Sequence, residues 1–167
     1  MKKLTVICLA ILSVCFMASC GGSKGAKVTS TTITIRSSDW DWRYMYTDED
    51  GNERGQYMAN IGYDAINSNV YNHGAVLVYM DVNGAWSQLP LTYYYLDGDF
   101  IAEASIEVST LGDEGVALFW TQSDYWKVAP ETRDFKIVAI EASVYQNRPD
   151  VDYSSYEAVK TAFQIAD

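Results

Sequence analysis

Residues 75–91, AVLVYMDVNGAWSQLPL, are the stretch of sequence that decides the fold. Asn83-Gly84 at its centre is typical of a two-residue type I′ turn, because both central residues of that turn need positive φ. Such a turn pairs four residues of one strand with four of the next, and seven of these eight are apolar: Val82 with Ala85, Met80 with Ser87, Val78 with Leu89 and Val76 with Leu91. The stretch therefore predicts a β-hairpin with one face in the core. The other face, which carries Tyr79 and Trp86, is predicted to be amphipathic or wet.

The same alternation of apolar and polar residues continues on both sides of this hairpin and predicts an all-β chain. Turn residues recur at short spacing, as is typical of an antiparallel β-sandwich of about eight strands. Further strands are expected at residues 32–36, 40–46, 56–61, 91–96, 100–109, 116–121 and 135–144. The last two are apolar on both faces, which indicates central strands covered on both sides.

The end of the chain has a helical pattern instead. Four residues recur at helical spacing after three candidate N-caps: Tyr156, Val159, Ala162 and Phe163 after Asp152, Ser154 and Ser155. We therefore expect one short C-terminal helix over residues 153–165. The sandwich and this helix are predicted to form a single domain over residues 31–167.

The start of the chain has the pattern of an export signal. Two lysines give a charged start, a mostly apolar run follows, and the small residues Ala18-Ser19 precede Cys20. This order predicts a signal peptide over residues 1–19. The apolar run is shorter than the roughly 18 to 20 residues that a membrane-spanning helix needs. Cleavage and secretion without lipidation is the alternative.

The segment Phe16-Met17-Ala18-Ser19-Cys20 resembles the lipobox of bacterial lipoproteins. The resemblance implies that residues 1–19 are removed and that the Cys20 thiol carries a diacylglyceryl group, which would anchor the chain to a membrane. Residues 20–30 would then be the lipidated cysteine and a flexible tether. By the same resemblance, Gly21 favours the outer membrane, and the choice between its periplasmic and surface faces stays open.

Charge and cysteine content limit the partners. Removing residues 1–19, which hold two lysines and no acid, leaves 148 residues with 10 basic and 22 acidic side chains, a net charge of −12. Such a chain is repelled by phosphate backbones and anionic headgroups, so we expect no nucleic-acid partner. Cys8 and Cys15 lie in the leader, and with Cys20 acylated no disulfide or thiolate metal site can form. We expect neither a metal nor a cofactor.

Acidic segments and one histidine are the candidate catalytic or metal-binding features. An EF-hand loop counted from Asp48 would need Gly and Glu where Glu53 and Ala59 stand, so a solvated hairpin tip is favoured over a calcium loop. A helix cap is the favoured interpretation of residues 150–152. His73 is interpreted as a surface turn residue, because no nucleophilic serine motif accompanies it. Paired carboxylates keep a hydrolase open as an alternative.

Aromatic residues are the remaining candidate feature. They bury large apolar areas in cores, and they also form flat platforms on which sugar rings stack. Tyr79 and Trp86 share the hairpin face opposite the core, and Tyr125 and Trp126 lie in a polar stretch that is predicted to be a loop. Core packing is the favoured interpretation, and a glycan- or peptide-binding surface formed by these four residues is the alternative.

Four further segments bear on the class of protein: residues 72–79, Leu89-Pro90, residues 135–138 and residues 152–157. Together they resemble a group of small β-rich bacterial lipoproteins of unknown function. The resemblance implies a fold and an anchor and transfers no catalytic residue. We therefore expect a lipid-anchored, non-catalytic envelope protein that binds a partner or takes part in envelope assembly. A glycan-binding surface module and a carboxylate-dependent hydrolase are the alternatives.

Overall fold

A computed structural model of the chain describes residues 27–123 and 127–166. The predicted signal peptide, Cys20 and residues 21–26 of the predicted tether lie outside the described residues, as do Tyr125 and Trp126. The described chain forms nine strands in two antiparallel sheets with few helices, which confirms the predicted all-β sandwich with a short C-terminal helix. The first strand begins at Val28, so the folded domain starts earlier than residue 31.

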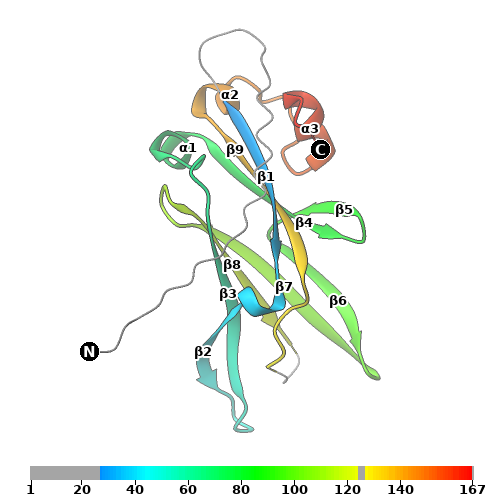
Figure 1. Cartoon of the computed structure of the whole chain (residues 1–167). Helices are drawn as coiled ribbons and strands as arrows, with labels where there is room; N and C mark the ends of the chain where they lie inside the picture. The colour runs from blue at the N-terminus through cyan, green and yellow to red at the C-terminus, as the bar shows by residue number, and fades with distance from the viewer. Residues whose placement is uncertain (1–26, 124–126, 167) are drawn as a thin grey trace, which may run out of the picture.

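One sheet has four strands in the order β1-β9-β4-β5, and the other has five in the order β2-β3-β8-β7-β6 (Figure 1). The four-stranded sheet contains β1 (Val28–Ile35), β9 (Arg133–Ile140), β4 (Ala75–Val82) and β5 (Ala85–Gln88). The five-stranded sheet contains β2 (Asp41–Thr47), β3 (Glu53–Gly62), β8 (Gly115–Gln122), β7 (Phe100–Thr110) and β6 (Leu91–Asp97). The edge strands are therefore β1, β5, β2 and β6.

The hairpin of β4 and β5 has the predicted turn. Asn83 and Gly84 both have positive φ, 55° and 83°. The predicted pairs next to the turn are confirmed: Val82 with Ala85 and Met80 with Ser87. The local chemistry of Asn-Gly thus set both the turn and the first part of the register.

The predicted register ends at Leu89, whose N–H donates to the carbonyl oxygen of Val78 over 2.8 Å. The predicted pair of Val76 and Leu91 is wrong, because Leu91 begins β6 and pairs with Ile106 in the other sheet. Pro90 has no N–H with which to continue the ladder, and the chain passes from one sheet to the other at this residue.

The core lies between the two sheets. On β7, Ala102, Ala104 and Ile106 are buried while Glu103 and Glu107 are exposed, so the predicted alternation is confirmed. The predicted central strands β8 and β9 are buried on both faces along most of their length. In β9 this requires a cover on the outer face of the four-stranded sheet as well, and the C-terminal helix provides it.

That helix, α3 (Tyr156–Phe163), begins after Ser155, whose side chain accepts a hydrogen bond from the N–H of Ala158. The helix α2 (Ala142–Gln146) replaces the end of the strand predicted over residues 135–144. The reason is that both neighbouring strands pair no further than Ile140, so β9 has no strand partner beyond it.

The helix α1 (Ser68–His73) corrects the predicted turn around His73, which is the last helical residue and is exposed. Asn67 caps this helix, because its side chain accepts hydrogen bonds from the N–H groups of Asn69 and Val70.

The sandwich has two different ends (Figure 1). We call the helical end the one with α1, α2, α3 and the β7–β8 turn. We call the hairpin end the one with the β2–β3 turn, the β6–β7 turn and the connection from β8 to β9. β1 runs from the helical end, where Val28 pairs with Ile140, to the hairpin end, where Ile35 pairs with Arg133. A short 3-10 helix, η1 (Ser37–Asp39), then leads to β2.

Candidate functional site

The predicted platform of Tyr79 and Trp86 is covered by α3. Tyr79 has 0% of its surface exposed, and Trp86 is half-buried. The ring of Tyr156 on α3 lies edge-on to both, with ring centroids 5.3 Å from Tyr79 and 5.9 Å from Trp86. The Tyr79 hydroxyl donates to the carbonyl oxygen of Tyr153 over 2.9 Å. Core packing, the favoured interpretation of these two side chains, therefore holds, because a helix from a distant part of the chain packs on them. The alternative of an open binding surface does not hold for this pair.

A buried lysine lies among these rings. Lys136 on β9 is 6% exposed and is the one buried charged side chain of the described residues. Its Nζ lies 4.6 Å from the ring centroid of Trp86 and 4.5 Å from that of Tyr156, and it donates to the Tyr156 hydroxyl oxygen over 2.9 Å. We call Tyr79, Trp86, Lys136 and Tyr156 the covered cluster. Its aromatic rings already hold a cation, which the protein itself supplies.

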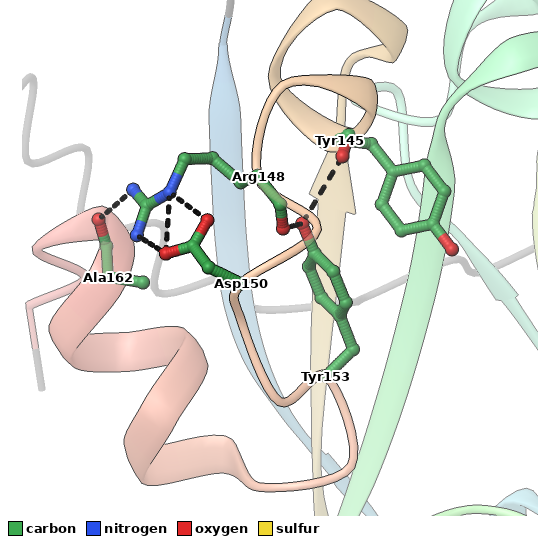
Figure 2. A network of polar contacts seen from close by, with 5 residues as sticks. All are labelled: Tyr145, Arg148, Asp150, Tyr153 and Ala162. Atoms are coloured by element: carbon green, nitrogen blue, oxygen red, sulfur yellow. Dashed lines mark hydrogen bonds and ion pairs between the residues drawn. The ribbon is translucent and has the colours of Figure 1, made fainter.

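Arg148 connects the segment that leads into α3 to the helix itself (Figure 2). Arg148 donates from Nε and Nη2 to the carboxylate of Asp150, over 3.0 and 3.1 Å, and from Nη1 to the carbonyl oxygen of Ala162 over 3.3 Å. The hydroxyl of Tyr153 donates to the carbonyl oxygen of Arg148 over 3.0 Å. The hydrogen bond from Arg148 lowers the pKa of Asp150. Asp150 therefore has a structural role, because it helps to hold α3 on the four-stranded sheet.

The acidic turn between β2 and β3 uses a carboxylate of its own. Asp48 accepts hydrogen bonds from the N–H groups of Asn52 and Asp50, over 2.8 and 3.1 Å, and from Nε of Arg54 over 2.9 Å. The hydrogen bonds from Asn52, that of its N–H first, and the one from Arg54 lower the pKa of Asp48. Within residues 27–123 and 127–166, no group of three His, Cys, Asp or Glu side chains is placed to hold a metal ion.

Exposed apolar side chains gather at the hairpin end. Eleven large apolar side chains of the described residues are exposed, and eight of them lie at this end. They come from three segments: Tyr44, Met45 and Tyr46 on β2, Tyr94, Leu96, Phe100 and Ile101 around the β6–β7 turn, and Val128 after β8. The four around the β6–β7 turn are 68–78% exposed. Contiguous exposed apolar patches mark interaction sites. The side chains around the β6–β7 turn are neighbours in one hairpin, whereas β2 is the opposite edge of the same sheet.

Behind these tips, the inner side of the hairpin end carries buried polar atoms. The indole Nε1 atoms of Trp40, Trp42 and Trp120 have no hydrogen-bond partner among the described residues, nor do Oε1 of Gln122 and Nε of Arg133. Buried polar groups are nearly always paired in native proteins, so each such atom needs an explanation. Five of them lie at this one end. In the covered cluster, by contrast, the polar groups of Tyr79, Lys136 and Tyr156 all have hydrogen-bond partners.

Trp42 is held in place by close packing on β3. A Cβ at Gly55 would lie 2.7 Å from Cζ2 of the Trp42 ring, so glycine is required for this approach. Nζ of Lys127 lies 5.6 Å from the centroid of the same ring and forms an ion pair with Glu53. Lys127 thereby connects the segment after β8 to the β2–β3 hairpin. Unlike Lys136, it is exposed.

A small recess lies at the helical end. It has a volume of about 120 Å³, and Lys27, Asp64, Asn67 and Glu141 are among its lining residues. Ligand pockets usually measure about 300 to 1,000 Å³. The recess brings two acids to one place, but it is smaller than a site for a sugar ring or a ligand of similar size.

Comparison of the chain with models of known protein families, with curated proteins and with solved structures found no match. None of the helices in the described part of the chain is long and apolar enough to cross a membrane. The arrangement at the hairpin end therefore has to be interpreted from its own chemistry.

The hairpin end contains the site residues that the sequence analysis missed. Leu96 and Phe100 directly flank the Asp97-Gly98-Asp99 turn, and Ile101 follows Phe100. Apolar residues this close to a turn were the available signal. The two other predicted ligand-binding residues, Tyr125 and Trp126, and the predicted lipid-attachment residue, Cys20, lie outside the described residues.

Proposed function

We propose that this protein is a lipid-anchored, non-catalytic component of the bacterial cell envelope that binds a partner through its hairpin end. The proposed anchor rests on the lipobox-like segment that ends at Cys20. The proposed binding surface rests on one observation, namely that eight of the eleven exposed large apolar side chains of the described residues lie at that end.

The direction of β1 supports a surface that faces away from the membrane. The strand has eight residues and runs from the helical end to the hairpin end. At about 3.4 Å per residue this amounts to roughly 25 Å. A tether that joins Cys20 to Val28 would enter at the helical end. The hairpin end would then lie at the far side of the domain, where partners can reach it.

The anchor is tested by replacing the cysteine. Cys20→Ala should move the protein from the membrane fraction to the soluble fraction and abolish incorporation of a labelled fatty acid. Cys15→Ala, in the same leader, is the matched control and should leave both unchanged. An acylated, membrane-bound Cys20→Ala protein would contradict the proposed anchor.

The binding surface is tested by photo-crosslinking in living cells. A photoreactive amino acid at Leu96 or Val128 should give discrete crosslinked adducts. The same amino acid at Tyr71 or Leu111, exposed apolar positions at the helical end, is the control and should give none. Adducts at the helical end alone, or equally at both ends, would contradict a binding surface at the hairpin end.

A glycan is the second candidate partner, and three exposed tyrosines favour it. Tyr44 and Tyr46 are each 56% exposed, and Tyr94 is 68% exposed. Exposed aromatic rings can stack on sugar rings. Neutral envelope polysaccharides should then change tryptophan fluorescence, and Tyr94→Ala should reduce that change while Tyr71→Ala should not. No change with any polysaccharide would leave a protein as the partner.

A further inference from the structure

The edge strand β6 differs from the other three edges of the two sheets. β5 has four residues, and β2 has a register shift between Tyr44 and Tyr46. β6 has seven residues, LTYYYLD, which pair with β7 without a register shift and include no Lys, Arg or Pro. Of the exposed large apolar side chains in the described ranges, none lies on β1 or β5. Short strands, bulges, Lys and Pro are the usual protections of an edge, and β6 has none of them. β1 is also regular and has no Lys, Arg or Pro, so β6 differs from β1 in its exposed apolar side chains, Tyr94 and Leu96.

The free edge of β6 presents backbone groups of three residues. Glu103 on β7 uses its N–H and carbonyl on Ser123, over 2.8 and 2.9 Å, so these groups face away from its cross-strand partner Tyr94. Glu103 and Tyr94 are therefore a non-hydrogen-bonded pair, in which the N–H and carbonyl of each residue point away from the other strand. Hydrogen-bonded and non-hydrogen-bonded pairs alternate along an antiparallel ladder, so every second pair of β6 and β7 has this geometry. The N–H and carbonyl groups of Thr92, Tyr94 and Leu96 therefore point away from β7.

The side chains of these residues lie on the outer face of the five-stranded sheet. Tyr93 and Tyr95 face inward, since Tyr93 packs on Trp120 and Tyr95 accepts a hydrogen bond from Gln122. Tyr94 and Leu96 consequently face outward, and Leu96 lies directly opposite Ile101 on β7. Tyr94, Leu96 and Ile101 are 68%, 78% and 74% exposed. An added strand would satisfy the backbone edge and cover these side chains.

We propose that β6 accepts an extended segment of a partner protein as an additional strand, with apolar side chains at alternate positions and a net positive charge. This inference rests on the proposed function and specifies how the hairpin end binds. Strand addition uses main-chain hydrogen bonds for affinity and alternate side chains for specificity. The charge of the chain, −10 in the full sequence, selects a basic segment and disfavours a second copy of the same acidic chain. Glu103 and Glu107, exposed on β7, add to this charge at the strand next to β6.

The test uses synthetic nine-residue peptides with blocked termini, and their binding is measured by fluorescence anisotropy. A peptide of alternating Val and Lys should bind, and one of alternating Val and Glu should bind at least tenfold more weakly. In a peptide that pairs with β6 as an antiparallel strand, the residue opposite Tyr94 has its side chain on the same face as Tyr94 and its N–H directed toward β6. The valines are expected to take these positions, because Tyr94 and Leu96 are apolar. Methylation of every valine nitrogen should therefore abolish binding, whereas methylation of every internal lysine nitrogen should leave it within about twofold, because those N–H groups face solvent.

The corresponding change in the protein is Tyr94→Pro, which removes one outward N–H without removing a bond to β7. It should weaken binding of the Val-Lys peptide at least tenfold, and Tyr94→Thr, which keeps the N–H, should weaken it less. Circular dichroism and thermal unfolding establish that both variants fold. If Tyr94→Pro does not fold, the two methylated peptides test the same hydrogen bonds on the unaltered protein.

Several outcomes would overturn the inference: no binding of the Val-Lys peptide at millimolar concentration, equal binding of both methylated peptides, or equal binding to a folded Tyr94→Pro. A homodimer that Tyr94→Pro dissociates would make a second copy the occupant instead. The crosslinking experiment separates this inference from the proposed function. Crosslinks at Leu96 without an effect of Tyr94→Pro would retain the binding surface and exclude strand addition. The absence of crosslinks at the hairpin end would remove both.

Discussion

The covered cluster and the hairpin end both place a lysine over a tryptophan ring, and they differ in what lies around that pair. Lys136 is buried between Trp86 and Tyr156, and its ammonium group has a hydroxyl partner. Lys127 lies over Trp42 at the surface, beside exposed apolar side chains and buried indole N–H groups without partners among the described residues. Lysine and tryptophan thus form a buried structural contact in the covered cluster and part of an exposed surface at the hairpin end.

The difference shows what aromatic content alone says about function. In the covered cluster, α3 supplies Tyr156, so the rings of β4 and β5 are used in folding. At the hairpin end, no described element covers Tyr94, Leu96 or Ile101. A binding function is therefore inferred from rings and apolar side chains that the protein leaves uncovered, and variants in the two regions should affect different properties.

The largest expected effect is on stability, in the covered cluster. Tyr156→Ala removes a ring that is 2% exposed and should lower the free energy of unfolding by about 3–5 kcal/mol, the usual cost of deleting a buried aromatic side chain. Tyr94→Ala, at a site 68% exposed, should change it by no more than about 0.5 kcal/mol. Urea unfolding followed by circular dichroism measures both. Similar losses in the two variants would mean that the hairpin end is as structural as the covered cluster.

The two lysines provide a closer comparison. Lys136→Met keeps an unbranched side chain of similar length but loses two cation–π contacts and a hydrogen bond, so stability should fall by about 1–3 kcal/mol. Lys127→Met loses an exposed ion pair and should cost no more than about 1 kcal/mol. Unfolding at low and high salt should show a salt-dependent difference for Lys127 alone. A Lys136→Met protein more stable than the parent would show that desolvation of the ammonium group outweighs its contacts.

Two tyrosine hydroxyls should respond differently to removal. Tyr79→Phe leaves the carbonyl oxygen of Tyr153 without its donor and should cost about 1 kcal/mol. The Tyr63 hydroxyl is buried and has no partner among the described residues, so Tyr63→Phe should be neutral or slightly stabilising. Thermal unfolding of the two variants at pH 7 measures the contrast. Equal losses would mean that the Tyr63 hydroxyl has a partner after all, such as a bound water.

Tyrosine ionisation should have the smallest effect on stability at neutral pH, and its effect should become measurable only above about pH 10. Burial raises the pKa of Tyr63 to about 12 and also raises that of Tyr79. The folded state therefore keeps these protons more tightly than the unfolded chain, in which tyrosine has a pKa of about 10. Their contribution to stability is complete below about pH 10 and is lost as the pH rises toward 12. Urea midpoints measured from pH 7 to 12 should fall above pH 10, and the fall should be smaller in Tyr63→Phe.

Local chemistry predicted the fold where a few adjacent residues carry the information. Asn83-Gly84 specified its turn, and Ser155 began the last helix, because both effects act within a few residues. The continuation of the hairpin register past Leu89 failed, since it depends on where the chain goes after Pro90. The strand predicted beyond Ile140 failed for a similar reason, since the limit is set by the ends of β1 and β4.

The candidate site was harder to predict, because exposure depends on contacts between distant segments. Tyr79 and Trp86 have the pattern of a half-wet strand face, and only the position of Tyr156 on α3 shows that they are covered. Leu96 and Ile101 have the pattern of ordinary strand residues, and they are exposed because no described element reaches the end of their hairpin. The sequence could suggest aromatic binding surfaces, but it could not say which rings remain accessible.

The direction of β1 also determines how the domain would respond to mechanical force. With a lipid at Cys20 and a ligand held at the hairpin end, tension would enter at Val28 and act along the axis of the strand. β1 would then have to slide lengthwise past β9, and the eight register pairs from Val28–Ile140 to Ile35–Arg133 would share the load at once. A strand anchored at its other end would instead be peeled away one pair at a time. The observed polarity of β1 would place such an attachment in shear, the geometry in which a β-ladder resists extraction best.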